Sequence, residues 1–258
     1  MHDCSALTFL ILGTLAHTAY PGPLRGTIVG GKEVKPHSRP YMASLQFGGH
    51  HLCGGTLIRP RWVLTAAHCE LKENLPAYRV VLGGHSLQHP EPSQQVFSIQ
   101  QAVPYPLYNA HTDVNDIQLL KLNSSALLNN FVKLARLPRR NSDLPPRARC
   151  RVMGWGDVTG LQVLPRGLME TNGTVVARES CNITWKGAIT QDMICVTGPH
   201  NSVEGVCGGD SGGPLFHKGR IQGIVSFSAP RCGDPRYPDV YARVSTFVSW
   251  IQDILQHY

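Results

Sequence analysis

The sequence predicts an all-β protein, and three observations support this. From Ile28 onward, short apolar stretches alternate with turn residues, and 26 Gly and 19 Pro are spread along the chain. Long amphipathic helices do not alternate with these stretches, so a parallel α/β sheet is not expected. The chain of 258 residues has room for one large β unit or two small ones. This pattern is typical of a β-sandwich or β-barrel.

The predicted strands are short and mostly apolar. They cover residues 55–58, 62–64, 78–82, 95–99, 117–122, 151–155 and 221–227. A stretch rich in Pro and Arg, residues 137–146, interrupts the series near the middle of the chain. Such a composition is typical of a connection. The sequence therefore suggests two similar β halves.

One helix is predicted at the end of the chain, over about residues 244–257. Phe247, Val248, Ile251, Ile254 and Leu255 fall on one side at helical spacing, and polar residues fall on the other. We expect the apolar stripe to pack on the body of the protein.

Residues 1–27 are predicted to be a signal peptide with a short propeptide. Residues 6–16 are apolar but too short to cross a bilayer, although no Lys or Arg precedes them. A buried strand or helix is the alternative. No later segment is apolar enough to span a membrane.

Cysteines and glycosylation motifs favour the secretory route. Of eight cysteines, Cys4 would leave with the signal peptide, so seven remain and at least one is unpaired within the chain. Asn123, Asn172 and Asn182 begin Asn-X-Ser/Thr motifs that could carry glycans.

The formal net charge of +7 favours anionic partners such as heparin-like glycosaminoglycans or bacterial envelopes. A mildly basic, solvated surface explains the charge equally well. Without a basic arm or a recognition motif, nucleic acid is not an expected partner. Among 12 histidines, His50 and His51 form the only adjacent pair, and no HExxH motif occurs. No metal or other cofactor is expected.

Three local patterns contain the residue types that acyl transfer requires. TAAHC contains His68, DIQLL begins with Asp116, and GDSGGP contains Ser211. Ser211 would be the nucleophile, His68 the general base, and Asp116 the group that orients the imidazole. The amides of Gly209 and Ser211 would form the oxyanion hole. Each residue alone has an ordinary structural explanation, but together they predict a catalytic triad.

The segment around Ser211 also satisfies the G-x-S-x-G pattern of α/β-hydrolases. That fold places an acid and then a histidine after the serine. Here only His217 and His257 follow Ser211, and the required helices are not predicted. The order His, Asp, Ser excludes this alternative.

With IVGG at residues 28–31 and CRVMGWG at residues 150–156, these motifs resemble the trypsin/chymotrypsin family, and in particular its granule proteases. The resemblance covers residues 28–258. It implies two antiparallel six-stranded β-barrels, at about residues 28–136 and 147–243. It further implies a monomeric, secreted or granule-stored serine endopeptidase that acts on proteins or peptides and is controlled by serpin-type inhibitors. A proteolytically silent, basic binding protein for heparin-like polymers or microbial surfaces is the alternative.

The resemblance also implies a zymogen. Cleavage between Thr27 and Ile28 would free the α-amino group of Ile28, which would pair with Asp210. Because Arg25 lies two residues before this bond, Gly26 and Thr27 could form a dipeptide that an aminodipeptidase removes.

By the family pattern, Gly205 forms the floor of the substrate pocket and Val206 adjoins it. Ser226, Phe227 and Ser228 would line one wall and pair with the substrate backbone, and Asp239 would lie on the opposite wall. Gly205 and Val206 favour small aliphatic side chains, whereas Ser228 and Asp239 favour arginine. We expect cleavage after arginine, unless Asp239 is paired internally behind Val206.

The resemblance implies three disulfides: Cys53–Cys69, Cys181–Cys195 and Cys207–Cys232. Cys150 is left over, because its usual partner position holds His217. Its thiol is either buried and inert, which we favour, or available for an intermolecular bond.

Overall fold

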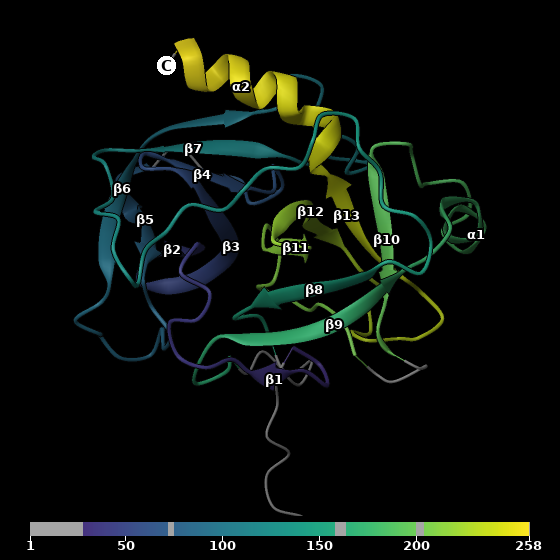
Figure 1. Cartoon of the computed structure of the whole chain (residues 1–258), viewed down its shortest axis with the longest axis horizontal. Helices are drawn as coiled ribbons and strands as arrows, with labels where there is room; N and C mark the ends of the chain where they lie inside the picture. Colours follow the sequence, from purple (N-terminus) through teal and green to yellow (C-terminus); the bar gives the residue numbers. More distant parts are fainter. Residues whose placement is uncertain (1–27, 72–74, 158–163, 200–203, 258) are drawn as a thin grey trace, which may run out of the picture.

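The computed structural model describes residues 28–71, 75–157, 164–199 and 204–257. Figure 1 shows two β-barrels side by side, the first in blue and teal and the second in green and yellow. The predicted signal peptide and propeptide, residues 1–27, lie outside the described residues.

The first barrel is closed by antiparallel strands in the order β2-β3-β4-β7-β6-β5. Leu57, Val80 and Leu119 are fully buried inside it. Its strands are β2 (Met42–Phe47), β3 (His50–Arg59), β4 (Trp62–Thr65), β5 (Tyr78–Leu82), β6 (Gln95–Pro104) and β7 (Gln118–Leu122).

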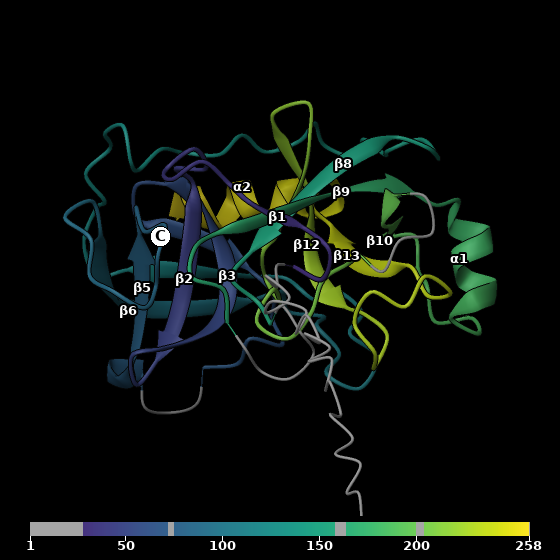
Figure 2. The same ribbon diagram turned by 90° about the horizontal axis from the view of Figure 1, so that it is seen from below.

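The second barrel contains six further antiparallel strands. They are β8 (Arg149–Gly154), β9 (Met169–Val175), β10 (Met193–Thr197), β11 (Pro214–His217), β12 (Arg220–Phe227) and β13 (Asp239–Arg243). Because β8 pairs with both β11 and β9, the ring closes. The short β1 (Lys32–Glu33) pairs with β9 outside the ring, and the two lie together in Figure 2. The predicted pair of six-stranded barrels is confirmed.

The C-terminal helix is also confirmed. A 3₁₀ turn, η3 (Val244–Phe247), leads into α2 (Val248–His257). Phe247 and Ile251 are buried in a core cluster that contains residues of both barrels, and the Tyr105 ring next to β6 meets the Phe247 ring edge-on, with centroids 4.9 Å apart. The helix therefore ties the end of the second barrel to the first.

Among the elements of the described ranges, the short helical segments η1 (Leu75–Ala77) and α1 (Arg178–Thr184) were not predicted. Only Cys181 is buried in α1, so the segment has no apolar stripe that periodicity could detect. Its disulfide to Cys195 holds it on the second barrel. In the described part of the chain, no helix has both the length and the apolar character needed to cross a bilayer.

The two barrels touch where β3 meets the turn before β11. The amide of Gly54 on β3 donates to the carbonyl of Ser211 at 2.8 Å. A methyl group on Gly54 would lie 2.9 Å from the Cα atom of Gly213. Glycine at residue 54 thus lets the backbone of one barrel touch the turn of the other.

Candidate active site

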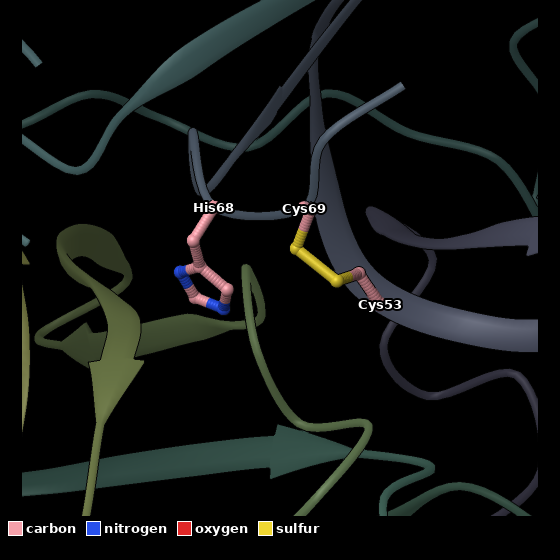
Figure 3. Close-up of side chains that lie close together, drawn as sticks. All are labelled: Cys53, His68 and Cys69. Carbon is pink, nitrogen blue, oxygen red and sulfur yellow. A yellow bond between two sulfur atoms is a disulfide. The ribbon is translucent and has the colours of Figure 1, made fainter. Parts of the chain in front are cut away.

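His68 lies on the loop that leaves β4. A disulfide from Cys69 to Cys53 on β3 clamps this loop, with an S–S distance of 2.03 Å. Figure 3 shows the imidazole and the disulfide projecting from neighbouring positions of the same loop. Ala66 and Ala67 before the histidine are buried, so the segment that leads to His68 is packed in the interior. The sulfurs are bonded to each other, so Cys53 and Cys69 do not form a metal site with His68.

Asp116 lies just before β7 and is fully buried. Its Oδ2 atom accepts a hydrogen bond from His68 Nδ1 at 2.6 Å, and its Oδ1 accepts from the His68 amide at 2.9 Å. The hydroxyl of Ser226 at the end of β12 also donates to Oδ2, at 2.6 Å. Since a carboxylate only accepts, Nδ1 carries the proton and Nε2 is free to act as a base.

The surroundings of His68 set its pKa. Burial lowers this pKa, but the hydrogen bond and negative charge of Asp116, with smaller contributions from Asp113 and Glu70, raise it by more. The net result is a pKa above the ordinary histidine value. The carboxylate thus stabilises the protonated imidazole that forms when the histidine takes a proton.

Ser211 lies in a tight turn between the two barrels. Gly209 and Gly212 on either side have φ angles of +93° and +76°, a region that L side chains rarely adopt. A methyl group on Gly212 would overlap the Thr65 hydroxyl and come within 3.1 Å of the Ala66 amide. The turn thus packs directly on the chain that leads to His68. Among the described residues, however, no hydrogen bond joins the Ser211 hydroxyl to the imidazole.

His51 is a site residue that the sequence did not reveal. Its Nδ1 lies 2.8 Å from the Ser44 hydroxyl and its Nε2 lies 2.9 Å from the Gly209 carbonyl. Burial lowers its pKa to about 4, although the bond to Gly209 partly offsets this, so the ring is neutral at neutral pH. A carbonyl only accepts, so Nε2 donates to Gly209 and Nδ1 accepts from Ser44. The contact spans 158 residues, and no local motif signals it.

Asp210 is fully buried beside the turn. Its carboxylate accepts hydrogen bonds from the amides of Gly156 at 2.9 Å and Cys207 at 3.0 Å. Burial raises its pKa to about 7; these two amides lower it and the charge of Asp157 raises it. No lysine or arginine of the described chain forms an ion pair with Asp210.

Ile28 is fully buried in the core of the second barrel, where it packs in the same cluster as Val206. The carbonyl of Val29 accepts a hydrogen bond from the Gly205 amide at 3.2 Å. The segment that would become the new N-terminus therefore lies against the floor of the predicted pocket.

The predicted pocket residues Gly205, Val206 and Asp239 lie together. The Val206 amide donates to Asp239 Oδ2 at 3.0 Å, and a methyl group on Gly205 would lie 2.8 Å from that oxygen. Burial raises the pKa of Asp239 to about 7, although the bond from Val206 lowers it. The Cys207–Cys232 disulfide links the segments on two sides of the pocket, with an S–S distance of 2.00 Å.

Cys150 is a free cysteine with 3% of its surface exposed. Burial raises the pKa of its thiol to about 12. His217, which occupies the position of the usual partner, instead contacts the Arg149 carbonyl through Nδ1 at 2.7 Å. A thiol with so high a pKa is a poor nucleophile at neutral pH, in keeping with the inert alternative.

The fold, and the paired His68 and Asp116 beside a partly buried serine in a glycine-flanked turn, are features of a serine endopeptidase. A family model described as Trypsin matches residues 28–251, so the chain belongs to the trypsin family and is a serine endopeptidase.

Individual relatives agree with this assignment. Serine protease 57 of Rattus norvegicus is 48% identical over 257 residues, covering 98% of this chain and 91% of that protein. Serine protease 57 of Homo sapiens is 51% identical over 231 residues, covering 89% and 81% respectively. The solved structure of neuropsin, a serine protease of mouse brain, aligns with a TM-score of 0.82 at 36% identity and covers 88% of this chain and 100% of its own.

Proposed function

We propose that this chain is a secreted or granule-stored endopeptidase with His68, Asp116 and Ser211 as its catalytic triad. The proposal rests on one observation above all. A buried carboxylate lies 2.6 Å from His68 Nδ1, on the side of the ring away from the free Nε2. This geometry leaves Nε2 unprotonated and available to the serine turn that packs against the same loop.

In the proposed reaction, Ser211 Oγ attacks the carbonyl carbon of the scissile bond while His68 Nε2 takes the hydroxyl proton. The amides of Gly209 and Ser211 bind the oxyanion. Nε2 then gives the proton to the leaving amine as the C–N bond breaks, and an acyl-enzyme remains. Water then attacks the acyl carbon while His68 Nε2 takes its proton. Nε2 gives this proton to Ser211 Oγ as the ester bond breaks, and the acyl group leaves as a carboxylic acid.

Ser211→Ala is expected to lower turnover on the order of a million-fold, because the nucleophile is lost while the fold is kept. The measurement is hydrolysis of a peptide by the chain that begins at Ile28. Labelling by a serine-directed organophosphonate should disappear in the same variant. If the wild-type chain neither cleaves the peptide nor reacts with the organophosphonate, the alternative of a proteolytically silent binding protein describes the chain better.

We further propose that activation frees the α-amino group of Ile28 to pair with Asp210. Support comes from a buried carboxylate without a cationic partner in the described chain and from a buried Ile28 in the same barrel. A buried charge needs a partner, and the new ammonium would supply it. If N-terminal sequencing of the active protein gave Gly26 as its first residue, this account would be wrong.

For the cleavage position we propose arginine over small aliphatic residues. Asp239 accepts a hydrogen bond from the Val206 amide and has no lysine or arginine partner in the described chain. A substrate guanidinium could supply the missing cation. The alternative is that Asp239 stays behind Val206 and the pocket takes valine.

A pair of peptides with arginine or valine at the cleavage position tests this preference. We expect arginine to be cleaved about tenfold faster or more, and Asp239→Asn to reduce that ratio. Efficient cleavage after valine alone would contradict the proposal.

Export would expose the chain to glycosylation and to polyanions. Asn123 and Asn172 are exposed, whereas Asn182 on α1 is partly buried. We expect Asn123 and Asn172 to carry glycans more fully than Asn182, and the mass shift of each site after enzymatic deglycosylation measures this.

The net charge of +7 supports glycosaminoglycan binding, and the salt concentration at which the protein elutes from heparin measures it.

A further inference from the structure

His85, on the loop between β5 and β6, has one ring nitrogen engaged and the other without a partner. Its Nε2 lies 2.8 Å from Glu33 Oε1, and only 7% of the residue is exposed. A carboxylate only accepts, so Nε2 carries a proton and donates to Glu33. Nδ1 of the neutral ring is then an acceptor, yet it is buried and no group of the described residues donates to it. A buried lone pair of this kind needs a donor or a cation.

The neighbours of His85 fix the orientation of its ring. A methyl group on Gly167 would overlap Nε2 and lie 2.8 Å from the Glu33 oxygen, so Gly167 closes that side of the ring. The His85 carbonyl accepts hydrogen bonds from the Trp155 indole at 2.9 Å and from the Leu168 amide at 3.0 Å. The ring is thus held with Nε2 toward Glu33, and Nδ1 is the nitrogen that lacks a partner.

His37 places a second imidazole nitrogen without a partner beside this ring. Its Nδ1 is also buried with no hydrogen bond within the described ranges, and the His37 and His85 ring centroids lie 6.3 Å apart. The Phe131 ring meets the His37 ring edge-on, with centroids 5.0 Å apart. His37 lies in a turn before β2, where Ser38 Oγ donates to the Lys35 carbonyl at 2.5 Å. Because the two histidines come from separate loops, no local motif indicated that they meet.

The separation of the two rings is close to that of imidazoles sharing a metal ion. Two imidazoles on one zinc ion have centroids roughly 5–6 Å apart, because each Zn–N bond is about 2 Å and the ion lies near both ring planes. The observed 6.3 Å is slightly longer. A small movement of the surface turn that carries His37 would close the difference.

The charges around the two rings favour a cation. Besides Glu33, a second carboxylate lies at His85: Glu91 Oε2 accepts from the His85 amide at 2.6 Å, and Glu91 Oε1 accepts from the Ser86 amide at 3.2 Å. No lysine or arginine of the described chain forms an ion pair with either glutamate. In a protein of net charge +7, these two carboxylates therefore form a local negative region without a basic partner.

We propose that His37 and His85 bind a divalent transition-metal ion such as Zn²⁺ through their Nδ1 atoms. Imidazole nitrogen is a preferred ligand of zinc, and water would complete the coordination shell. Glu33 would support the site from behind, because a carboxylate that accepts from the other ring nitrogen fixes the tautomer of a metal-bound histidine. Since the His85 carbonyl binds Trp155 and Leu168 next to β8 and β9, the ion would tie the turn before β2 to both barrels. The site shares no residue with the proposed triad and does not depend on the proposed function.

The test titrates Zn²⁺ into the chain that begins at Ile28. Calorimetry measures the binding, and thermal unfolding measures Tm. We expect one zinc ion to bind at this site and to raise Tm by about 3–6 °C once free zinc exceeds its Kd tenfold, because the ion binds the folded chain. Mg²⁺, which prefers oxygen ligands, should raise Tm much less.

Two variants remove parts of the proposed site. His37→Asn removes one ligand and keeps the tolerance for the φ of +60° at this residue. It should weaken zinc binding about tenfold or more and abolish the rise in Tm. Glu33→Gln keeps an oxygen that can accept from Nε2 but removes the charge, and it should weaken zinc binding about tenfold to a hundredfold. Neither residue is fully buried, so both variants should melt near the wild-type temperature without zinc.

Two other histidine variants are the matched controls. His89→Asn removes an exposed imidazole from the loop that follows His85. His68→Ala removes the imidazole that lies with Asp113 and Asp116 in a separate cluster of possible ligands. Both variants should keep the rise in Tm that zinc causes in the wild-type chain.

Failure of the wild-type chain to bind zinc at millimolar concentration would overturn the inference. Zinc binding that is unchanged in both His37→Asn and Glu33→Gln, or that is lost only in His68→Ala, would also overturn it. If His37→Asn melts early without zinc, its loss of binding reflects folding, and Glu33→Gln then decides the question. Peptide hydrolysis without added metal tests the proposed endopeptidase separately, so either proposal can fail alone.

Discussion

At the scale of single residues, His51 holds the carbonyl of Gly209, whose amide is the proposed oxyanion donor. The imidazole is buried between the Ser44 hydroxyl and this carbonyl, and its ring meets Trp155 edge-on, with centroids 5.8 Å apart. Holding this carbonyl restricts rotation of the peptide between Gly209 and Asp210, which lies between the two proposed oxyanion donors, the amides of Gly209 and Ser211. We therefore regard His51 as a positioning residue for the oxyanion hole.

His51→Phe is expected to lower kcat by about tenfold to a hundredfold with little change in KM. The loss should be smaller than removal of an oxyanion donor, which costs about 10²–10³ in kcat, because the amide remains but is less well oriented. Steady-state kinetics of the mature enzyme would measure the effect, and a peptide boronate should bind correspondingly less tightly.

Ser44→Ala is the matched control for this variant. It removes the partner of Nδ1 but leaves the contact between Nε2 and Gly209, so its effect on kcat should be smaller. A rise in KM at constant kcat in His51→Phe would show that the residue acts on substrate binding instead.

At the scale of elements, β3 supports the serine turn through backbone contact. The Gly54 amide donates to the Ser211 carbonyl at 2.8 Å, and the Cβ of an alanine there would lie 2.9 Å from Gly213 Cα and 3.1 Å from its amide nitrogen. These are backbone atoms, which cannot rotate aside. One barrel thus fixes the position of the turn that the other carries.

Gly54→Ala should destabilise the protein by about 1–3 kcal/mol and reduce activity, because the turn must move away from β3. Urea unfolding and peptide hydrolysis measure the two effects. Gly208→Ala is a control for stability, since its added methyl group would meet nothing within 4 Å. Unchanged stability in Gly54→Ala would mean that the turn is free to shift.

At the scale of the whole molecule, two buried carboxylates make stability depend on pH. Burial raises the pKa of both Asp210 and Asp239 to about 7, while amide hydrogen bonds lower it. Between about pH 4 and pH 7 these two carboxyls therefore bind more protons in the folded chain than in the unfolded chain, and they make the free energy of unfolding fall as the pH rises. His51, whose pKa is lowered to about 4, contributes in the opposite direction.

Activation should reduce this pH dependence. When the ammonium of Ile28 pairs with Asp210, the pKa of that carboxyl falls and its contribution disappears, while that of Asp239 remains. The chain beginning at Gly26 should thus lose more stability from pH 4 to pH 7 than the chain beginning at Ile28. The difference amounts to about 1.4 kcal/mol for each pKa unit removed.

Urea unfolding of both chains at several pH values measures this difference. Asp210→Asn should give the two chains the same dependence of the free energy of unfolding on pH, because the titrating carboxyl is then missing from both chains. Identical pH dependence in the two wild-type chains would argue against pairing between Ile28 and Asp210.

The sequence by itself determined the all-β class, the apolar strands, the C-terminal helix and the three motif residues. The strands and the helix are recognised from apolar periods that repeat within a few residues. The three motif residues are recognised because acyl transfer requires particular residue types. The short helix α1 escaped prediction because seven residues with one buried side chain carry no period.

Only the tertiary structure decided which residues surround the proposed triad. His51 reaches Gly209 across 158 residues, and Asp113 lies beside His68 because Val114 of its loop packs on the other barrel. Such contacts follow from how two closed barrels meet, and no local pattern encodes them. The same packing buries Asp210 and Asp239, and no lysine or arginine of the described ranges pairs with them, so the charge balance of the site is a property of the folded molecule.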